Sequence, residues 1–336
     1  MSNEQSDEII DRVIAESIRF YAKNYQLQTW EMGKGKDKVV LGSKGINKCR
    51  FCLRSSPEAS FRNEAHAIPE SLGNKSIFTR YECDECNQRF GNTIENDLGS
   101  WFLPIRTFSG IKGKNNYPTI KSRDGKSRIE SSLRGINIAH QSDNRFFSSD
   151  EENKILTFNV PVPKYRPIGV WKSFIKIGLS LIDENRIGYF EDTIKWLVDD
   201  PKGHQPIRMW PVQSYFIPGP GRSDSISVSM LYRIDDYVKL PYAMLFIMYG
   251  SQSFQVIIPS NRKDFAVEAP SFQLPMLLPF DEETAKQYGF PRVMQFDLSR
   301  TDFVEDEEVT IQGTYDTVIQ LENSDESEAG GPNPDP

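Results

Sequence analysis

The four cysteines of this chain stand in two identical pairs, and both pairs have the spacing of zinc ligands. Cys49 and Cys52 form the first C-x-x-C pair, Cys83 and Cys86 the second, and 30 residues separate the pairs. Two such pairs are typical of a closed tetrahedral Zn²⁺ site. The alternative is two disulfides in a secreted protein. The chain opens with the polar, charged run MSNEQSDEIIDR, which is unlike a secretory signal, so we expect structural Zn²⁺ in a cytoplasmic protein.

The segment between and just after the pairs carries groups suited to phosphodiester hydrolysis. It contains the run EAHAIPESLGN, from Glu64 to Asn74, and Asn87 directly follows the last cysteine. A water that attacks phosphorus must lose a proton, and imidazole is the commonest general base near neutral pH. His66 is therefore the candidate base. A divalent cation such as Mg²⁺, held by oxygen or imidazole ligands, would stabilise the leaving oxygen and the phosphate charge.

These motifs resemble the HNH endonuclease family in its four-cysteine branch. The resemblance rests on C-x-x-C, then AHAIPESLGN, then CDECNQRFGNTIENDL, and it covers roughly residues 44–115. It implies a ββα-metal fold, in which a hairpin and a helix hold one catalytic divalent metal. It also implies cleavage of nucleic acid, with DNA favoured over RNA, and a role for the Asn87 carboxamide oxygen as a ligand of the catalytic metal. Proteins of this layout resemble effectors of mobile elements and antiviral defence.

Two positions depart from the family pattern. Many members have an aspartate or histidine directly before the base, where this chain has Ala65. Glu64 is the nearest carboxylate and would share a strand face with His66, so it is a candidate replacement ligand or a group that holds the imidazole tautomer. Phe78 stands where the central asparagine of the family is expected, and Asn74 is the candidate substitute. His66 itself is either the base or a ligand of the catalytic metal.

Local patterns predict how these residues are positioned. We expect a hairpin with strands over residues 61–68 and 77–81, ended and turned by Pro69 and Gly73. A helix should begin near Asp84 and continue to Trp101, because residues 90, 94, 98 and 101 are apolar at helical spacing. On a straight helix Glu95 would lie about 12 Å from Asn87. Glu95 is therefore expected to form a salt bridge or a contact behind the metal ligands.

Charge is distributed unevenly along the chain. The formal net charge is −7, yet residues 44–150 carry 17 Lys and Arg against 12 Asp and Glu, and residues 301–336 carry 11 acidic residues and no basic one. The basic excess predicts that polynucleotides bind the motif segment. Its densest part, residues 106–134, is either a flexible loop that follows a phosphate backbone or a solvated linker. A truncation before Phe158 should keep most of this binding.

The periodicity of apolar residues predicts an α+β protein with the following domains and segments. We expect an N-terminal amphipathic helix (residues 6–24) and linker over 1–43, the nuclease domain over 44–115, a basic and polar linker over 116–157, an accessory α+β domain over 158–315, and an acidic disordered tail over 316–336. In the accessory domain, helices over 170–181 and 189–198 precede an antiparallel sheet of strands over 213–217, 225–234, 243–249 and 253–258. His140, in the predicted linker, and His204, in the accessory domain, are expected to be surface or hinge residues.

Two classes of function compete. The first is a metal-dependent HNH endonuclease whose accessory domain recognises a substrate or trigger, binds a regulatory partner or forms a homo-oligomer. The second is non-enzymatic: a zinc-knuckle protein that binds nucleic acid or acts as a scaffold, with a lapsed catalytic site, in keeping with Ala65 and Phe78. No membrane interaction is expected, because no run approaches 18 apolar residues.

Overall fold

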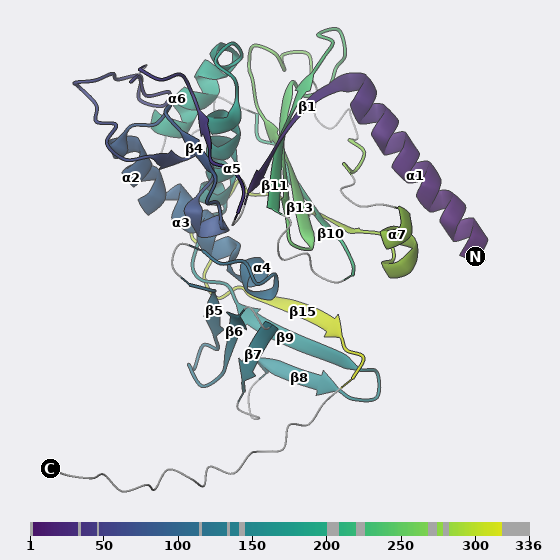
Figure 1. Ribbon diagram of the computed structural model, residues 1–336. Helices are drawn as coiled ribbons and strands as arrows, with labels where there is room; N and C mark the ends of the chain where they lie inside the picture. The colour runs from purple at the N-terminus through teal and green to yellow at the C-terminus, as the bar shows by residue number, and fades with distance from the viewer. Residues whose placement is uncertain are drawn as a thin grey trace, which may run out of the picture.

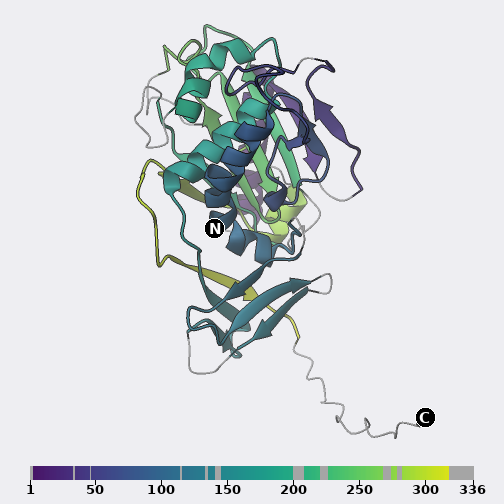
Figure 2. The ribbon, with the colours of Figure 1, turned by 90° about the vertical axis from the view of Figure 1, so that its left-hand side faces the viewer.

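The computed structural model describes residues 3–32, 35–45, 47–113, 116–132, 135–140, 145–199, 208–219, 226–267, 274–277 and 282–317. Figure 1 shows a larger upper part, in which helices lie against a twisted sheet, and a smaller lower part made of strands. Figure 2 shows the same two parts from the side. Helices and largely antiparallel sheets confirm the predicted α+β class. Within these ranges no helix is both long enough and apolar enough to cross a bilayer.

A six-stranded antiparallel sheet organises the C-terminal half of the chain. Its strands, in spatial order, are β1 (Tyr25–Met32), β11 (Ile226–Arg233), β12 (Ala243–Tyr249), β13 (Gln252–Ile258), β10 (Val212–Phe216) and β14 (Arg292–Phe296). Strands β10 to β13 occupy the runs where strands were predicted. β12 and β13 form the expected hairpin, and Gly250 adopts φ 60° at its turn. A positive φ of this kind costs glycine little.

The N-terminal segment contributes both a helix and a strand of this sheet. Helix α1 (Asn3–Asn24) confirms the predicted amphipathic helix and packs against α7 (Glu282–Tyr288) through Ile10. Strand β1 pairs with β11 from Tyr25 opposite Arg233 to Met32 opposite Ile226. The residues expected to link the helix to the motif segment are thus largely a strand. Their aromatic and β-branched residues favour a strand, but the partner strand lies about 200 residues later in the chain.

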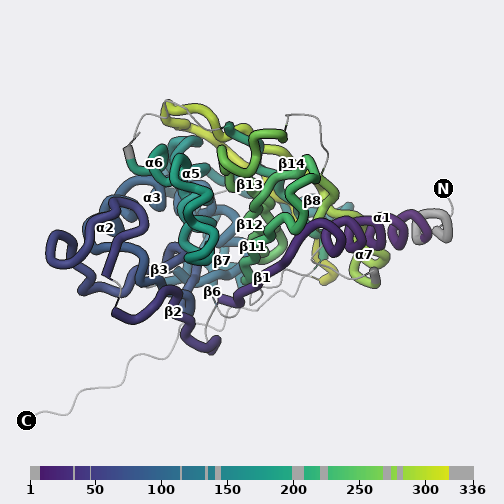
Figure 3. The backbone as a smooth tube through the Cα atoms, turned by 90° about the horizontal axis from the view of Figure 1, so that it is seen from above, coloured from purple at the N-terminus to yellow at the C-terminus, as the bar shows by residue number. Residues whose placement is uncertain are grey.

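Helix α5 (Pro167–Leu181) lies between the sheet and the motif segment (Figures 1 and 3). All 15 of its residues are buried. It packs against β12 and β13 on one side, against α3 (Ile94–Trp101) on another, and against α6 (Glu191–Asp199). One continuous apolar core contains residues of both the motif segment and the C-terminal half. A truncation before Phe158 would remove the helix against which the motif segment packs, so the expectation that such a fragment keeps its binding is not supported.

Residues 116–157, expected as a linker, form strands in the described part of the chain. One three-stranded sheet contains β5 (Thr119–Lys121), β6 (Arg128–Ser132) and β7 (Gly135–Ala139), and a second contains β8 (Phe147–Asp150), β9 (Ile155–Pro161) and β15 (Glu308–Thr314). Ile120 and Ile129 are buried with Phe158 between these sheets. Arg123 pairs with Asp306 and Glu308, so part of the basic run is neutralised. These strands were missed because each buries at most two side chains among polar neighbours.

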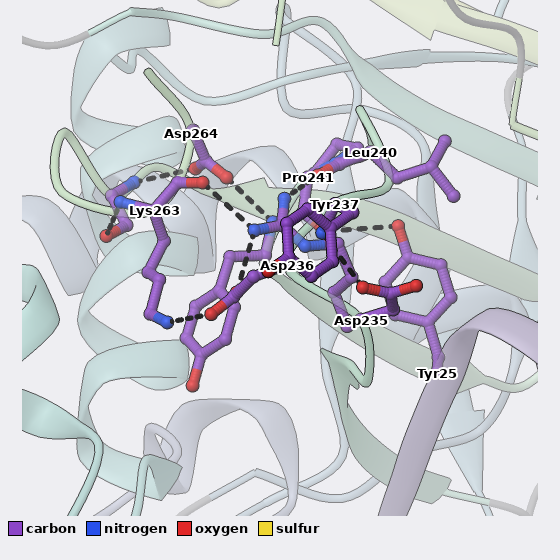
Figure 4. Close-up of polar contacts among 11 residues, drawn as sticks. Tyr25, Asp235, Asp236, Tyr237, Leu240, Pro241, Lys263 and Asp264 are labelled. Carbon is purple, nitrogen blue, oxygen red and sulfur yellow. Dashed lines mark hydrogen bonds and ion pairs between the residues drawn. The ribbon is translucent and has the colours of Figure 1, made fainter. Parts of the chain in front are cut away.

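Polar contacts join the loops at one end of the six-stranded sheet (Figure 4). The half-buried Asp264 carboxylate accepts hydrogen bonds from the main-chain N–H of Tyr242, at 2.7 Å, and of Ser260, at 2.9 Å. The Tyr25 hydroxyl donates to the Pro241 carbonyl at 3.0 Å. Burial raises the pKa of Asp264 to about 6, against the effect of these hydrogen bonds. The contacts tie the β11–β12 loop to β1 and to the segment after β13, and so fix the sheet under α5.

The predictions for His140, His204 and the acidic tail remain. His140 is exposed, and its ring contacts Phe147 with 5.4 Å between the centroids. His204 lies outside the described residues, as do residues 318–336 of the expected acidic tail.

Candidate functional site

A short hairpin and a helix build the motif segment. Strands β3 (Ala65–His66) and β4 (Ile77–Thr79) pair antiparallel, with His66 opposite Phe78, and β2 (Val39–Leu41) lies parallel to β4. Both hairpin strands are shorter than predicted. The 3-10 turn η1 (Glu70–Leu72) and Gly73, at φ 87°, fill the connection after Pro69, and α2 (Asp84–Asn92) begins at the predicted residue. The expected hairpin-then-helix order is present.

The helix predicted to reach Trp101 is interrupted at Thr93. Helix α2 ends at Asn92 and α3 begins at Ile94, because Thr93 adopts φ −123° and ψ −95°. The Gly-Asn-Thr sequence here is weak in helix propensity, and the Thr93 hydroxyl donates to the Arg89 carbonyl at 2.7 Å. Helix α4 (Leu103–Phe108) follows α3. The 12 Å separation expected along one straight helix therefore does not describe the relation of Asn87 to Glu95.

The four cysteine thiols lie together as a metal site requires. Their Sγ atoms all lie within 4.8 Å of one another, and the Sγ atoms of Cys52 and Cys83 are 3.7 Å apart. A tetrahedral ion with Zn–S bonds of about 2.3 Å places its sulfur ligands about 3.8 Å apart, so the arrangement fits Zn²⁺. All four are free thiols. In the described part of the chain, this is the one group of three or more His, Cys, Asp or Glu side chains placed to hold a metal.

The electrostatics of the thiols also favour a bound cation. A hydrogen bond from the Cys86 thiol, together with main-chain N–H groups, lowers the pKa of Cys49 to about 4. The same hydrogen bond and burial raise the pKa of Cys86. The thiolate is the form that binds zinc, and neighbouring thiolates repel one another. A Zn²⁺ ion supplies the positive charge that lets all four ionise.

His66 lies at the edge of the hairpin, with 25% of its side chain exposed. Its ring packs against that of Phe78, with 4.6 Å between centroids. Burial lowers the pKa of His66 below its ordinary value of 6.5; Lys176 and Lys75 lower it further, and Glu70 opposes the shift. The imidazole is therefore uncharged at neutral pH, which is the form that accepts a proton.

Asn74 is completely buried and holds the turn after the first strand. Its amide nitrogen donates to the carbonyls of Ile68 and Ile77, each at 2.8 Å. Its oxygen accepts from the main-chain N–H of Ser76, at 3.1 Å, and of Ile77, at 2.9 Å. Both amide protons are used in this way, so the 3.4 Å between Asn74 Nδ2 and His66 Nδ1 is a packing contact. Asn74 thus packs against the His66 ring, and its amide nitrogen and oxygen are both used in hydrogen bonds to the main chain, so it is not placed to ligate a metal.

Of the two carboxylates close to His66 in the sequence, Glu64 and Glu70, the structure places Glu70 beside the imidazole, whereas the sequence pointed to Glu64. Both oxygens of Glu64 accept from Lys38, at 2.7 and 2.6 Å, and its side chain is 60% exposed. Glu70 Oε2 lies 4.0 Å from His66 Nε2, while its other oxygen pairs with Lys75 at 2.5 Å. The sequence could have indicated Glu70, because it lies four residues after His66 and follows Pro69, where the strand ends and a helical turn begins.

Asn87 and Glu95 have different surroundings. Asn87 lies half-buried in the first turn of α2, where its main-chain N–H donates to the Cys83 carbonyl at 3.0 Å. Its carboxamide makes no hydrogen bond with another residue that the structure describes, so its oxygen is available to a metal or phosphate. Glu95 pairs with Lys176 at 2.9 Å, which is the salt bridge expected for it.

Comparison with known families agrees with this geometry. Residues 49–103 match the model of the HNH endonuclease family, so this segment of the chain belongs to that family. The resemblance carried by the cysteine pairs, the histidine block and the following helix is thereby confirmed. No curated protein and no solved structure shows significant similarity to the chain. Family membership indicates a nuclease-type domain that acts on nucleic acid.

Proposed function

We propose that this protein is a metal-dependent HNH endonuclease that hydrolyses phosphodiester bonds, in DNA rather than RNA. One observation carries the proposal: within the segment that matches the family, His66 is partly exposed, uncharged at neutral pH and 4.0 Å from a carboxylate. The zinc knuckle and the buried Asn74 hold this histidine on a fixed backbone. A positioned, neutral imidazole at the surface is what a general base for water requires.

The residues around His66 divide into distinct roles. His66 takes the proton from the attacking water, or ligates the catalytic metal if another group acts as base. Mg²⁺ or a similar divalent ion, when bound, supplies positive charge at the phosphate and leaving oxygen. Asn87 and one carboxylate, Glu70 or Glu64, would provide the oxygen ligands, and water would complete the coordination that such ions accept. Between the two carboxylates we favour Glu70, because Lys38 occupies both oxygens of Glu64.

Incubation of the purified protein with plasmid and with RNA, in the presence of Mg²⁺, Mn²⁺ or Ni²⁺, tests the activity directly. We expect the plasmid to be nicked or linearised and RNA to be cut less. Absence of cleavage of either polymer with every metal would contradict the proposal.

Charge-neutral variants of the carboxylates distinguish the ligand that replaces the one missing at Ala65. We expect Glu70→Gln to lower the cleavage rate and to raise the metal concentration needed for half-maximal rate, because an amide is a weaker ligand than a carboxylate. Asn87→Ala should act in the same direction, and excess metal should partly restore both. Glu64→Gln is the matched control and should cut at close to the parent rate. A metal-rescuable loss in Glu64→Gln alone would assign the role to Glu64 instead.

Polynucleotide binding should weaken steeply with salt, because the basic excess of residues 44–150 neutralises phosphates and releases counterions. Lys121 and Lys126 are exposed on the β5–β6 hairpin. Replacing both by glutamine should lower the slope of log affinity against log salt by about one unit for each of the two lysines that binds a phosphate. Lys239→Gln, an exposed lysine in the β11–β12 loop, is the control. An equal decrease in the control would place the phosphate-binding surface elsewhere.

The layout of the chain extends the proposal to its biological role. An HNH domain joined to a further α+β part resembles effectors of mobile elements and antiviral defence, in which the added part responds to a partner or forms a homo-oligomer. If this holds, cells that express the protein should resist phage infection, and cells that express His66→Ala should not. Equal infection of both would contradict the defence role without bearing on the nuclease activity.

A further inference from the structure

Side chains of the HNH domain hold both ends of helix α5. At its start, Asp97 accepts a hydrogen bond from the main-chain N–H of Arg166 at 3.1 Å and pairs with the Arg166 guanidinium at 3.0 Å. At its end, the Arg50 guanidinium donates to the carbonyl of Leu179 and, at 2.9 Å, to that of Ile182. An acid at the N-terminus and a base at the C-terminus of a helix both complement its dipole. Both ends of α5 are therefore held by side chains of the HNH domain.

Lys176, in the middle of α5, places its ammonium group inside the HNH domain. The Lys176 side chain is 0% exposed. Its ammonium lies 3.0 Å from Glu82 Oε2 and 2.9 Å from Glu95 Oε1, and it donates to the main-chain carbonyl of His66 at 3.1 Å. An ammonium has three N–H donors, and three oxygen atoms surround this one. A buried charge is tolerated only with such compensation.

The three oxygen atoms belong to three different parts of the nuclease domain. Glu82 directly precedes the zinc ligand Cys83, Glu95 lies on α3, and the His66 carbonyl belongs to the strand that carries the candidate base. Glu82 is itself fully buried, and neither of its carboxylate oxygens has a hydrogen-bond partner among the described residues, so the contact of its Oε2 with Lys176 is an ion pair. Lys176 is therefore both the counter-charge of Glu82 and a donor that fixes the backbone at His66.

We propose that Lys176 is a positioning residue, through which the docking of α5 controls the cleavage site. The inference rests on the proposed nuclease function and adds a means of regulation to it. The α+β part supplies the donor that holds the His66 main chain, so a displacement of α5 changes the placement of the imidazole.

Lysine variants of α5 test the assignment. Lys176→Met keeps the length of the side chain and removes its charge, and we expect kcat to fall by about tenfold to a hundredfold, as small misplacements of catalytic groups do, with KM unchanged. Lys172→Met is the matched control, because Lys172 is buried one turn earlier on the same helix, with its ammonium 4.3 Å from the centroid of the Trp196 ring. It should cut at close to the parent rate. An unchanged kcat in Lys176→Met would overturn the proposal.

A double variant separates positioning from stability. Lys176→Met leaves Glu82 as an uncompensated buried carboxylate, and adding Glu82→Gln removes that charge. We expect the double variant to recover thermal stability relative to Lys176→Met but not kcat, because the His66 carbonyl still lacks its donor. Recovery of kcat together with stability would show that Lys176 only balances a buried charge, and the proposal would fail.

Hydrogen–deuterium exchange gives a readout that does not depend on cleavage. Exchange of the hairpin peptide over residues 65–79 should be faster in the double variant than in the parent, and unchanged in Lys172→Met. If the parent protein cuts nothing, the nuclease proposal fails, yet faster exchange would still support the positioning of this hairpin by Lys176. Equal exchange in the double variant and the parent would overturn the positioning role, whatever the parent cleaves.

Discussion

Replacing His66 with alanine should lower the cleavage rate by about a hundred- to ten-thousandfold, the usual cost of losing a general base, while the fold is retained. The ring is partly exposed and packs mainly on Phe78, so its loss removes little of the apolar core. Plasmid cleavage with each divalent metal measures the rate, and circular dichroism and thermal unfolding measure the fold. Excess metal should not rescue this variant, in contrast to Asn87→Ala.

The pH dependence follows from the same residue. Because burial lowers the pKa of His66 below its ordinary value of 6.5, the base gains a proton at a lower pH than an exposed histidine does. The parent rate should therefore change little between pH 8 and 7, and it should decline at lower pH as the imidazole gains a proton. His140→Ala, which removes an exposed histidine outside the HNH domain, is the control and should follow the parent profile. Cleavage by His66→Ala at the parent rate with all metals would exclude His66 as the base, whereas a parent protein that binds nucleic acid and cuts none would favour the non-enzymatic alternative.

Removal of zinc should have the largest effect on stability. We expect about one Zn²⁺ per chain by elemental analysis, and we expect Cys83→Ser or a strong chelator to unfold the HNH domain. The binding free energy of a structural zinc, about 10–16 kcal/mol in small zinc domains, is available only to the folded state. Since the HNH domain shares one core with α5 and the sheet, the unfolding transition of the whole chain should move to lower denaturant concentration.

Adding Zn²⁺ back to chelated protein is the control, and it should restore the original transition in the parent but not in Cys83→Ser. Folded protein that contains no zinc would contradict the prediction. So would mass spectrometry that finds two disulfides in place of four thiols.

Local features of the candidate site were predictable because they depend on short-range geometry. The spacing of Cys49 with Cys52 and of Cys83 with Cys86 is itself the spacing of a metal site, and the four sulfur atoms do meet. The glycine turn and the start of α2 follow from backbone preferences at single residues. The helix break at Thr93 was not predicted, because the apolar residues continue at helical spacing across it. The weak helix propensity of Gly91, Asn92 and Thr93 was the signal for the break.

Amino-acid order alone predicted the family of the motif segment, the four cysteines as candidate metal ligands, His66 as the candidate base and the α+β class, because each rests on neighbours within a few residues or on fixed spacing. Only the tertiary structure decided which groups surround them. Glu70 lies beside His66 through a tight turn, and β1 pairs with a strand some 200 residues away. Lys176 reaches the His66 carbonyl from a helix 110 residues further on. Helical periodicity predicts that Lys172 and Lys176 lie on the same face of their helix. It does not predict that Glu82 and Glu95 surround Lys176, because those contacts form only when separate elements pack together.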